Sequence, residues 1–326
     1  MKAIVATKYG PPDVLQLKDV EIPTPKDDEV LIKIQAASLN AYDWHLLTAD
    51  IFLVRLMGGG FLKPKNKIPG ADIAGRVEAV GRSVTQFHPG DDVFGEISHG
   101  GFAEYACARE DRLATKPANL SFEEAAAVPM AALTALRGLR DKGRIQPGQK
   151  VLIHGASGGV GTFAVQMAKL FGAEVTAVCS TGKMDQARSL GADQVIDYTQ
   201  EDFTKARQRY DLIFAANGYH PILEYRRALS AKGIYVMAGG TKAQIFQAML
   251  LGPWISMAGS RKMGGLSANV NQKDLVFIKE LLEAGKIRPV IDRRYPLSDV
   301  PQALRYLGEG HARGKVVISI ELQGNS

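Results

Sequence analysis

Cysteine is scarce in this 326-residue chain, which contains Cys107 and Cys179, too few for a disulfide framework or a multi-cysteine metal site. No apolar run approaches the roughly 20 residues that a membrane-spanning helix requires. Residues 1–7 alternate like a strand and lack the apolar core of a signal peptide. These absences exclude a disulfide-rich secreted class, and we expect a cytoplasmic protein with reduced thiols and no membrane span.

A basic cluster of the kind that binds nucleic acid is also missing. Lysine and arginine outnumber aspartate and glutamate by 40 to 34, but they are scattered and not interleaved with aromatic residues. The net charge of +6 therefore indicates a solvated surface that favours phosphate-bearing ligands, and we expect no nucleic-acid partner. The composition, 46% hydrophobic and 23% charged, is that of a globular protein, and the length favours two domains.

A glycine-rich loop lies between a predicted strand, residues 150–154, and a predicted helix, residues 160–171. Such a loop lets backbone N–H groups approach a pyrophosphate, and the helix N-terminus adds its positive end. The spacing Gly-x-x-Gly-x-x-Gly departs from the usual Gly-x-Gly-x-x-Gly, so the flanking strand and helix carry the inference. A merely structural turn is the alternative. The predicted cofactor-binding residues of the loop are Gly155, Ala156, Ser157, Gly158, Gly159, Val160 and Gly161.

Strand and helix segments alternate after this loop, which predicts an α/β fold with a parallel, doubly wound sheet. Before the glycine-rich loop, short strands broken by proline and glycine turns predict a small antiparallel barrel or partly open β unit. Ser121 and Glu124 have the spacing of a capping box, which predicts that a helix begins there. The C-terminal strand, residues 315–320, cannot readily extend the parallel sheet without another crossover helix. We therefore predict that the chain returns to the first domain after about residue 265. Further buried strands are predicted at 174–179, 194–197, 212–215 and 234–237. The predicted domain limits are 1–121, 122–264 and 265–326.

The segment after the second strand of the parallel sheet lacks the acidic residue that commonly accepts the ribose 2′-hydroxyl of NAD. Ser180, Thr181 and Lys183 stand there instead. A carboxylate would repel a 2′-phosphate, whereas hydroxyls and an ammonium would hold one. The segment therefore favours NADP(H) over NAD(H). The alternative is that Lys183 is a solvated residue in the first turn of the next helix.

Five motifs together resemble the medium-chain dehydrogenase/reductase superfamily, and most of all its zinc-free quinone oxidoreductase branch. The resemblance covers nearly the whole chain and implies a GroES-like β domain, built from both chain ends, with a Rossmann domain. It also implies a cofactor cleft and, commonly, dimers formed along the sixth Rossmann strand. The motifs are Pro69–Gly81, Pro89–Val93, Gly101–Tyr105, Gly155–Gly161 and Gly314–Val317.

The sixth Rossmann strand is predicted at Trp254–Gly259, within an apolar run that covers residues 245–259. So much apolar surface near an exposed sheet edge favours pairing with a second copy. We therefore expect a homodimer with two-fold symmetry.

Metal ligands are absent from the positions that the resemblance assigns to them. Asn40 stands where zinc-dependent members place a cysteine, and Ala71-Asp72 stands where they place His-Glu. A catalytic zinc needs three good ligands and an open position. We therefore expect no metal site.

The resemblance places the family's active-site helix directly after Asn40. It implies that Asn40 contacts the nicotinamide end of the cofactor and that Asp43 is structural. Tyr42 and His45 occupy the proton-relay positions of alcohol dehydrogenases, and a phenol and an imidazole can pass a proton to the reduced substrate. The alternatives are that Tyr42 is a pocket wall and that His45 caps the helix or contacts ribose. Residues 50–67 follow as either a flap over a pocket or a packed loop.

Six further cofactor positions rest on the same resemblance. It implies that Thr134 lies near the nicotinamide and pyrophosphate and that Tyr198 lies near the adenosine phosphate. Lys315 either reaches the phosphate or is a surface charge. Asn217, Gly239 and Gly240 end the fourth and fifth Rossmann strands, where the cofactor lies along the carboxyl edge.

These inferences predict a zinc-independent, NADPH-dependent oxidoreductase that transfers hydride to quinones or to α,β-unsaturated carbonyl compounds (enones). One alternative is a zinc-free NADP-dependent alcohol dehydrogenase or aldehyde reductase that uses Tyr42 and His45. The other is an NADPH-binding interaction or structural protein with little turnover. Reduced quinones and enones are stabilised anions, so the absence of a strong acid is compatible with the first prediction.

Overall fold

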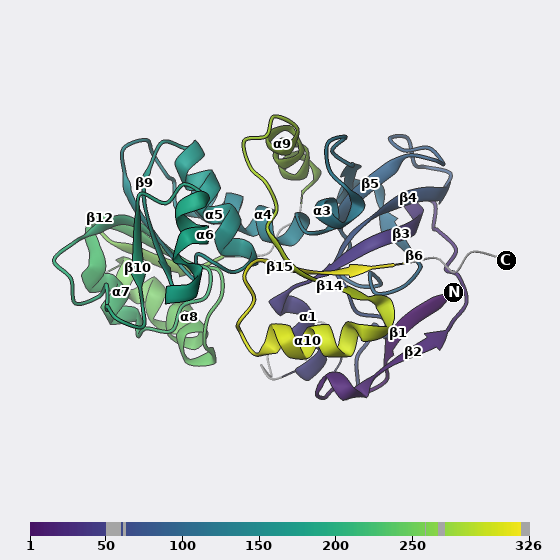
Figure 1. Ribbon diagram of the computed structural model, residues 1–326, viewed down its shortest axis with the longest axis horizontal. Coiled ribbons are helices and arrows are strands. Elements are labelled where there is room, and N and C mark those ends of the chain that lie inside the picture. Colours follow the sequence, from purple (N-terminus) through teal and green to yellow (C-terminus); the bar gives the residue numbers. More distant parts are fainter. Residues whose placement is uncertain (50–59, 61–62, 258, 267–270, 321–326) are drawn as a thin grey trace. The chain divides into compact units, whose positions relative to one another are not determined.

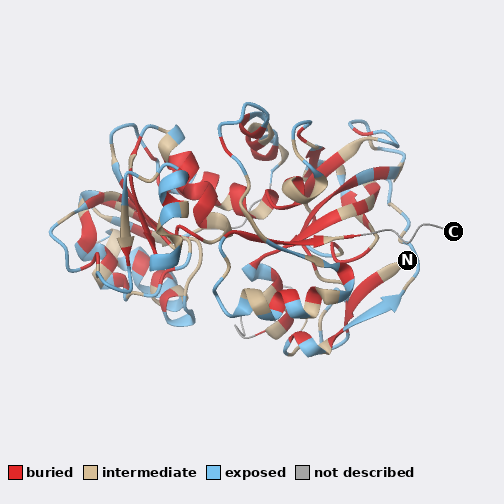
Figure 2. Ribbon diagram, viewed as in Figure 1, coloured by how far each residue is buried: buried red, intermediate tan, exposed pale blue. Residues whose placement is uncertain are grey.

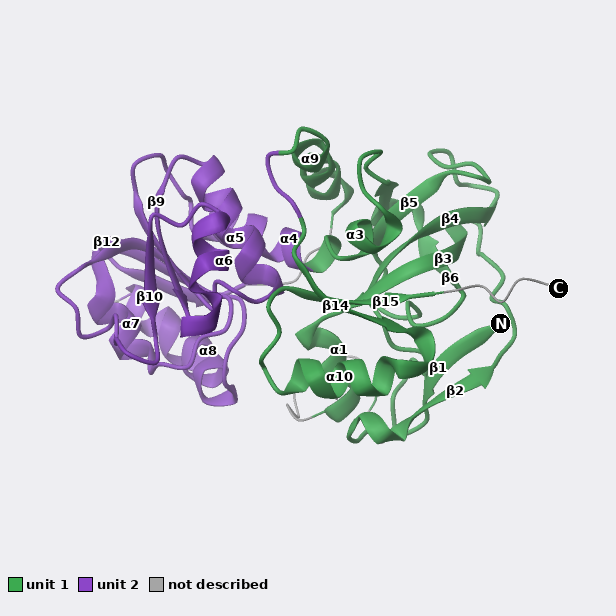
Figure 3. Ribbon diagram, viewed as in Figure 1, with its two compact units in different colours: residues 1–130, 270–285, 289–326 green, residues 131–269, 286–288 purple. Residues whose placement is uncertain are grey.

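The computed structural model describes residues 1–49, 60, 63–257, 259–266 and 271–320. The chain forms two compact units, shown in Figure 3. Unit 1 contains residues 1–130, 270–285 and 289–326, and unit 2 contains residues 131–269 and 286–288. Unit 1 is therefore built from both ends of the chain, as the resemblance implies. The predicted flap at 50–67 falls largely on residues outside the described ranges.

The units change at 130/131 and 269/270, whereas the predicted limits are 121/122 and 264/265. The first difference has a physical cause, since the helix that opens at Ser121 packs on the sheet of unit 1. This helix, α3 (Phe122–Ala126), contacts β3, β4 and β15. Its predicted capping box is confirmed: Ser121 Oγ accepts from the Glu124 N–H at 3.1 Å, and Glu124 Oε2 accepts from the Ser121 N–H at 2.9 Å.

The main sheet of unit 1 has seven strands and is antiparallel except at one edge, where β14 and β15 run parallel. A separate antiparallel pair is formed by β1 (Lys2–Ala6) and β2 (Leu15–Asp19). The long strand β3 pairs with β15 and β6 on one side and with β4 on the other. The order is β14 (Ile291–Pro296), β15 (Lys315–Ser319), β3 (Glu29–Leu39), β4 (Asp72–Val80), β5 (Asp92–Glu96) and β7 (Leu113–Thr115), with β6 (Tyr105–Arg109) on β3.

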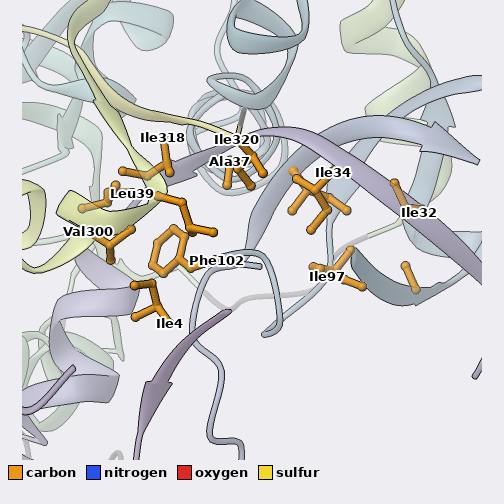
Figure 4. Close-up of a cluster of buried hydrophobic side chains, with 14 of the residues drawn as sticks. Ile4, Ile32, Ile34, Ala37, Leu39, Ile97, Phe102, Val300, Ile318 and Ile320 are labelled. Atoms are coloured by element: carbon orange, nitrogen blue, oxygen red, sulfur yellow. The ribbon is translucent and has the colours of Figure 1, made fainter. Parts of the chain in front are cut away.

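Buried aliphatic side chains from distant parts of the sequence form the core of unit 1. Figure 4 shows Ile4 of β1, Leu39 of β3 and Ile318 of β15 around Phe102, with Val300 close by. Val300 belongs to α10 (Val300–Gly308), which packs on α1 (Ala41–Thr48). A further helix, α9 (Gln272–Glu283), packs on β7. The core thus fixes β3, whose end carries Asn40 and α1.

Unit 2 holds a six-stranded sheet in which every neighbouring pair is parallel. Numbered from its first strand, the order is 3-2-1-4-5-6, so the predicted doubly wound Rossmann sheet is confirmed. In Figure 2 its central strands are mostly buried. The order is β10 (Gln194–Asp197), β9 (Glu174–Cys179), β8 (Lys150–His154), β11 (Tyr210–Ala215), β12 (Leu229–Met237) and β13 (Lys262–Gly265).

Helices connect these parallel strands (Figure 1). Helix α4 (Pro129–Arg137) leads into unit 2 and continues as a short π-helical turn, Gly138–Lys142. Helices α5 (Gly159–Leu170) and α6 (Met184–Ser189) pack on β8, β9 and β10. Helix α7 (Ile222–Ala228) packs on β12, and α8 (Lys242–Met257) packs on α7 and β13. Among the described residues, no helix is both long and apolar enough to cross a membrane.

The strand predicted at Trp254–Gly259 is wrong, because residues up to Met257 belong to helix α8 and the edge strand is β13. Apolar side chains stand on both the buried and the exposed sides of α8, so the run shows no clear helical period. Gly252 brings the helix close to β13: a Cβ at this position would lie 2.9 Å from the carbonyl oxygen of Met263. The dimer stays a prediction, and the residues predicted to form its contact belong to helix α8 up to Met257.

Candidate functional site

The glycine-rich loop leaves β8 at the point where the strand order reverses. Gly155 has a φ of +82°, which favours glycine, and a Cβ here would lie 2.9 Å from the backbone nitrogen of Asn217. The N–H of Ala216 donates to the carbonyl oxygen of His154 at 2.9 Å. The ends of β8 and β11 are thus held together at the position where doubly wound sheets bind ligands.

Gly161 and Gly158 differ in how much room a side chain would have at each position. A Cβ at Gly161, in the first turn of α5, would collide with the carbonyl oxygen of Gly155 and lie 2.7 Å from atoms of Ala156. A Cβ at Gly158, the N-cap of α5, would meet Gly155 O at 3.7 Å and no other described atom within 4 Å. Packing therefore requires Gly161, whereas Gly158 leaves open space among the described residues at a helix N-terminus, the kind of position at which proteins bind phosphate groups.

Three more predicted cofactor residues gather at the same sheet edge. Gly239 follows β12, and its N–H donates to the carbonyl oxygen of Ala215 at 3.2 Å. Gly240 forms an isolated parallel bridge with Gly218, the residue after Asn217. The structure thus brings Asn217, Gly239 and Gly240 to the carboxyl ends of β11 and β12. Thr134 lies half-buried on α4, and its role stays a prediction.

The turn after β9 lies against an acid at the end of β10 that the sequence reasoning missed. Thr181 donates its hydroxyl to Asp197, at the end of β10, and Thr199 donates to the other Asp197 oxygen from its N–H at 3.0 Å and its hydroxyl at 2.8 Å. These donors, led by Thr181, lower the pKa of Asp197. The expectation that no acid stands near Ser180, Thr181 and Lys183 is therefore wrong. Asp197 pairs with Cys179 in the register of β10 and β9, so its place could have been inferred from parallel pairing.

Two exposed tyrosines follow β10 and β11. The ring of Tyr198 lies 5.9 Å from that of Tyr219 in an edge-to-face arrangement, and Tyr219 was not identified from the sequence. The ring of Tyr219 also lies 4.8 Å from that of His154. Stacking or edge contact with a flat ligand is the chemistry that such exposed rings offer.

Buried polar side chains, with His154 at their centre, form hydrogen bonds next to this edge of the sheet. The Nδ1 atom of His154 lies 2.7 Å from the hydroxyl of Tyr225, and Gln244 Nε2 donates to the Tyr235 hydroxyl at 2.5 Å. Burial lowers the pKa of His154 to about 3, and His220 adds to the shift. The His154 imidazole is therefore neutral at physiological pH and serves as a structural hydrogen-bonding group.

In unit 1, sheet register brings Asn40 into contact with charged residues far away in the sequence. Pairing of Val316 with Leu39 places Lys315 beside Asn40, and pairing of Ser38 with Asp72 places the carboxylate on the other side. Lys315 Nζ donates to Asn40 Oδ1 at 2.5 Å, and Asn40 Nδ2 donates to Asp72 Oδ2 at 3.0 Å. Lys315 is buried, so the surface-charge alternative for this residue is wrong. Its predicted contact with phosphate stays a prediction.

Asp43 lies at the start of α1, which begins after Asn40 as predicted. Its Oδ2 accepts from the Asn40 N–H at 2.8 Å, while its Oδ1 has no hydrogen-bond partner among the residues that the structure describes. Burial, with a contribution from the charge of Asp72, raises the pKa of the Asp43 carboxyl to about 7. Asp43 thus caps α1 as a structural residue and carries a proton over much of the acid range.

Tyr42 and His45, the predicted proton donor and its relay, stand three residues apart on α1 and share a helix face. Tyr42 is 40% exposed and His45 is half-buried. Partial burial, followed by the negative charges of Asp43 and Glu96, raises the pKa of Tyr42. The phenol is therefore protonated at neutral pH and has a proton to give, although it is a weak acid.

The comparisons with known proteins show which family the chain is similar to. The family described as alcohol dehydrogenase GroES-like domain matches residues 26–118, and the one described as zinc-binding dehydrogenase matches residues 190–318. The chain is 38% identical to 2-methylene-furan-3-one reductase of Solanum lycopersicum, covering 98% of this chain and 79% of the relative. It is 35% identical to the chloroplastic NADPH-dependent alkenal/one oxidoreductase of Arabidopsis thaliana, with the same coverage.

A solved structure extends the likeness to the whole fold. The quinone oxidoreductase from Coxiella burnetii is 32% identical and has a TM-score of 0.88, covering 98% of this chain and 99% of that one. The resemblance inferred from the five motifs is confirmed. The chain belongs to the medium-chain dehydrogenase/reductase superfamily, in its zinc-free quinone oxidoreductase-like branch, whose members are oxidoreductases that use a nicotinamide cofactor.

Proposed function

We propose that the protein is an NADPH-dependent reductase of quinones and α,β-unsaturated carbonyl compounds. The observation that carries the proposal is the agreement between relatives named as enone, alkenal and quinone oxidoreductases and a Rossmann edge with an open phosphate position at Gly158. Bound NADPH would supply a hydride for the β-carbon of an enone or for a quinone. The protein contributes binding, orientation and exclusion of water.

The residues of unit 2 fit this cofactor. The loop at 155–161, Asn217 and Gly239–Gly240 would hold the pyrophosphate and the adjoining ribose, and Tyr198 would lie near the adenosine phosphate. Ser180 and Lys183 would hold the 2′-phosphate, which makes NADPH the preferred cofactor, whereas the Thr181 hydroxyl already donates to Asp197. Asp197 keeps its negative charge, so the preference depends on the ammonium of Lys183 to offset it, while the Asp197 oxygens already accept hydrogen bonds from Thr181 and Thr199.

Catalysis without zinc is part of the proposal. Asn40 and Ala71 stand where zinc-dependent members have ligands, and Asn40 Oδ1 already accepts from Lys315. Protein purified without a metal-affinity step should contain far less than one zinc per chain, and chelators should leave the activity unchanged. One tightly bound zinc per chain would contradict this part.

A second candidate function is supported by the position of Tyr42 and His45 on one face of α1. A protonated phenol with an imidazole one turn away is the equipment of a zinc-free alcohol dehydrogenase or aldehyde reductase. NADPH consumption with a panel of quinones, enones and aldehydes separates the candidates. Turnover of aldehydes alone would favour the second candidate, and binding of NADPH with negligible turnover would favour a structural or interaction protein.

We also propose that two copies associate through α8. Its outer face is apolar, with Leu250 67% exposed, Trp254 73% exposed and Met257 83% exposed, and β13 next to it is the last strand of the sheet. Burying these side chains between copies would remove a large apolar surface from water. Light scattering at micromolar concentration should give a dimer, and Trp254→Ser should give a monomer. Leu17→Ser, on β2 of unit 1, is the matched control and should leave the dimer intact.

A cytoplasmic location completes the proposal. Cys107 and Cys179 are both free thiols, which agrees with a reducing compartment. Cell fractionation with specific antibody should find the protein in the cytoplasmic fraction. Recovery from an organelle, such as the chloroplast after which one relative is named, would contradict the location.

A further inference from the structure

The side-chain amide of Asn40 is held at both ends inside unit 1. Lys315 Nζ reaches its oxygen at 2.5 Å, and its nitrogen reaches Asp72 Oδ2 at 3.0 Å. The side chains of Lys315 and Asp72 are 3% and 0% exposed, and they also contact each other at 3.3 Å. An asparagine clamped between a buried cation and a buried anion has little freedom to rotate.

The two charges also determine which way the amide points. An ammonium group can donate but not accept, and a carboxylate can accept but not donate. The Asn40 oxygen must therefore face Lys315, and one of the two N–H groups must face Asp72. Among the residues that the structure describes, the second N–H group of Nδ2 has no recorded acceptor, and Asn40 is 8% exposed.

Asp72 is itself fixed from several directions. Its Oδ1 accepts from the backbone N–H of Met130 at 3.0 Å, and its Oδ2 also accepts from the Ser38 hydroxyl at 3.3 Å. Taking an ammonium and a carboxylate out of water is costly, and a buried ion pair is weak evidence for a gain in stability. Such a pair is more easily explained if it orients something, and the group that it orients here is Asn40.

We propose that Lys315 and Asp72 are positioning residues that hold the Asn40 amide as a donor, through its second N–H, to a carbonyl oxygen of a bound ligand. The donor is a neutral group at the position where zinc-dependent relatives carry a metal ligand. The oxygen belongs to the substrate or to the carboxamide of the nicotinamide. The inference rests on the proposed function for the identity of the ligand. The hydrogen-bonded group of Lys315, Asn40 and Asp72, which we call the clamp, lies within unit 1 itself.

Two variants separate positioning from simple structural support. Lys315→Met keeps the length of the side chain but leaves Asp72 buried without its cation, so its melting temperature should fall. The double variant Asp72→Asn/Lys315→Met removes both charges and should regain most of that loss. Its Asn40 amide now faces an amide that can donate or accept, so the orientation is no longer imposed. Arg76→Met/Asp92→Asn, an exposed ion pair in the same sheet, is the matched control.

The readouts are the melting temperature, the NADPH dissociation constant, and kcat and KM for an enone. In the double variant we expect near-native melting with a loss of about tenfold to a hundredfold in kcat/KM or in NADPH affinity. A loss in NADPH affinity that Asn40→Ala shares identifies the nicotinamide carboxamide as the ligand oxygen, because Asn40→Ala keeps Lys315. A loss in kcat/KM with NADPH affinity unchanged identifies the substrate oxygen.

Recovery of melting temperature, affinity and kcat/KM together in the double variant would overturn the positioning role. Wild-type values for Asn40→Ala in both NADPH affinity and kcat/KM would overturn the donor role of the amide. If wild-type protein binds NADPH but reduces no enone or quinone, the proposed function fails. The clamp is then tested by the NADPH affinity alone. Unchanged NADPH affinity in both the double variant and Asn40→Ala would overturn it.

Discussion

The hydroxyl of Thr181 donates to the carboxylate of Asp197, which joins the turn after β9 to the end of β10. The acid therefore stands beside the segment that is proposed to receive the 2′-phosphate. Both oxygens of the carboxylate already accept hydrogen bonds from within the protein, from Thr181 and Thr199. Ser180 and Lys183 are left as the groups on which a preference for NADPH depends.

Lys183→Ala should raise the NADPH dissociation constant by about tenfold to a hundredfold, as expected for loss of a charge-assisted hydrogen bond to phosphate. The NADH dissociation constant should change little, because NADH has no 2′-phosphate. Fluorescence titration of both cofactors measures the effect, and Lys232→Ala, an exposed lysine of the same unit, is the control. Equal affinity of the wild-type protein for the two cofactors would contradict the preference.

The two glycines at the start of α5 should respond differently to alanine. Gly161→Ala places a Cβ against Gly155 and Ala156, so the melting temperature should fall markedly. Gly158→Ala meets open space, so the fold should tolerate it, but the methyl group would occupy the position proposed for the pyrophosphate. We expect Gly158→Ala to melt near the wild-type temperature and to bind NADPH at least tenfold more weakly. Wild-type NADPH affinity in this variant would place the phosphates elsewhere.

The fold of unit 2 was largely predictable, because alternating apolar strands and helices define a doubly wound sheet almost without long-range information. The glycine loop was predictable for the same reason, since its strand and helix are its immediate neighbours. Helix α8 was not, because its apolar residues face both β13 and the outside. Periodicity fails when neither face of a helix is polar.

The clamp around Asn40 shows a different limit. Lys315 and Asn40 are separated by 275 positions and meet because β15 pairs with β3 in one register. Nothing local in the sequence specifies that register, so Lys315 could be read either as a phosphate ligand or as a surface charge. Asp197 is an intermediate case, since the parallel pairing of β10 and β9 would have located it.

The raised pKa of Asp43, about 7, predicts how stability depends on pH. In the unfolded chain the carboxyl loses its proton near pH 4. Between about pH 4 and pH 7 the folded protein therefore binds a proton that the unfolded chain has lost, so this group makes stability fall as pH rises. The slope approaches about 1.4 kcal/mol per pH unit, and it vanishes above pH 7.

Asp43→Asn should remove this slope while keeping an oxygen to accept from the Asn40 N–H. Urea unfolding at several pH values between 4.5 and 8 gives the free energy of unfolding for both proteins. The difference between variant and wild type should grow in favour of the variant as pH rises to 7 and then stay constant. Parallel curves over the whole range would show that Asp43 is ionised in the folded protein.

Tyr42→Phe should separate the substrate classes. An aldehyde must be protonated on oxygen as it is reduced, so loss of the phenol should lower turnover by about a hundredfold or more. A quinone yields a stabilised anion that takes its proton from water, so its rate should survive. Steady-state rates with one substrate of each class measure this, with NADPH affinity and melting temperature as checks. Equal losses for both classes would assign Tyr42 a packing role.

The position to which the hydride goes tests the account most directly. NADPH that carries deuterium on the transferred position of the nicotinamide is incubated with the protein and an acyclic enone, and the product is analysed by mass spectrometry and NMR. The account predicts a saturated ketone with deuterium on the former β-carbon. An allylic alcohol with deuterium on the former carbonyl carbon would contradict it and identify an alcohol dehydrogenase type of reduction instead.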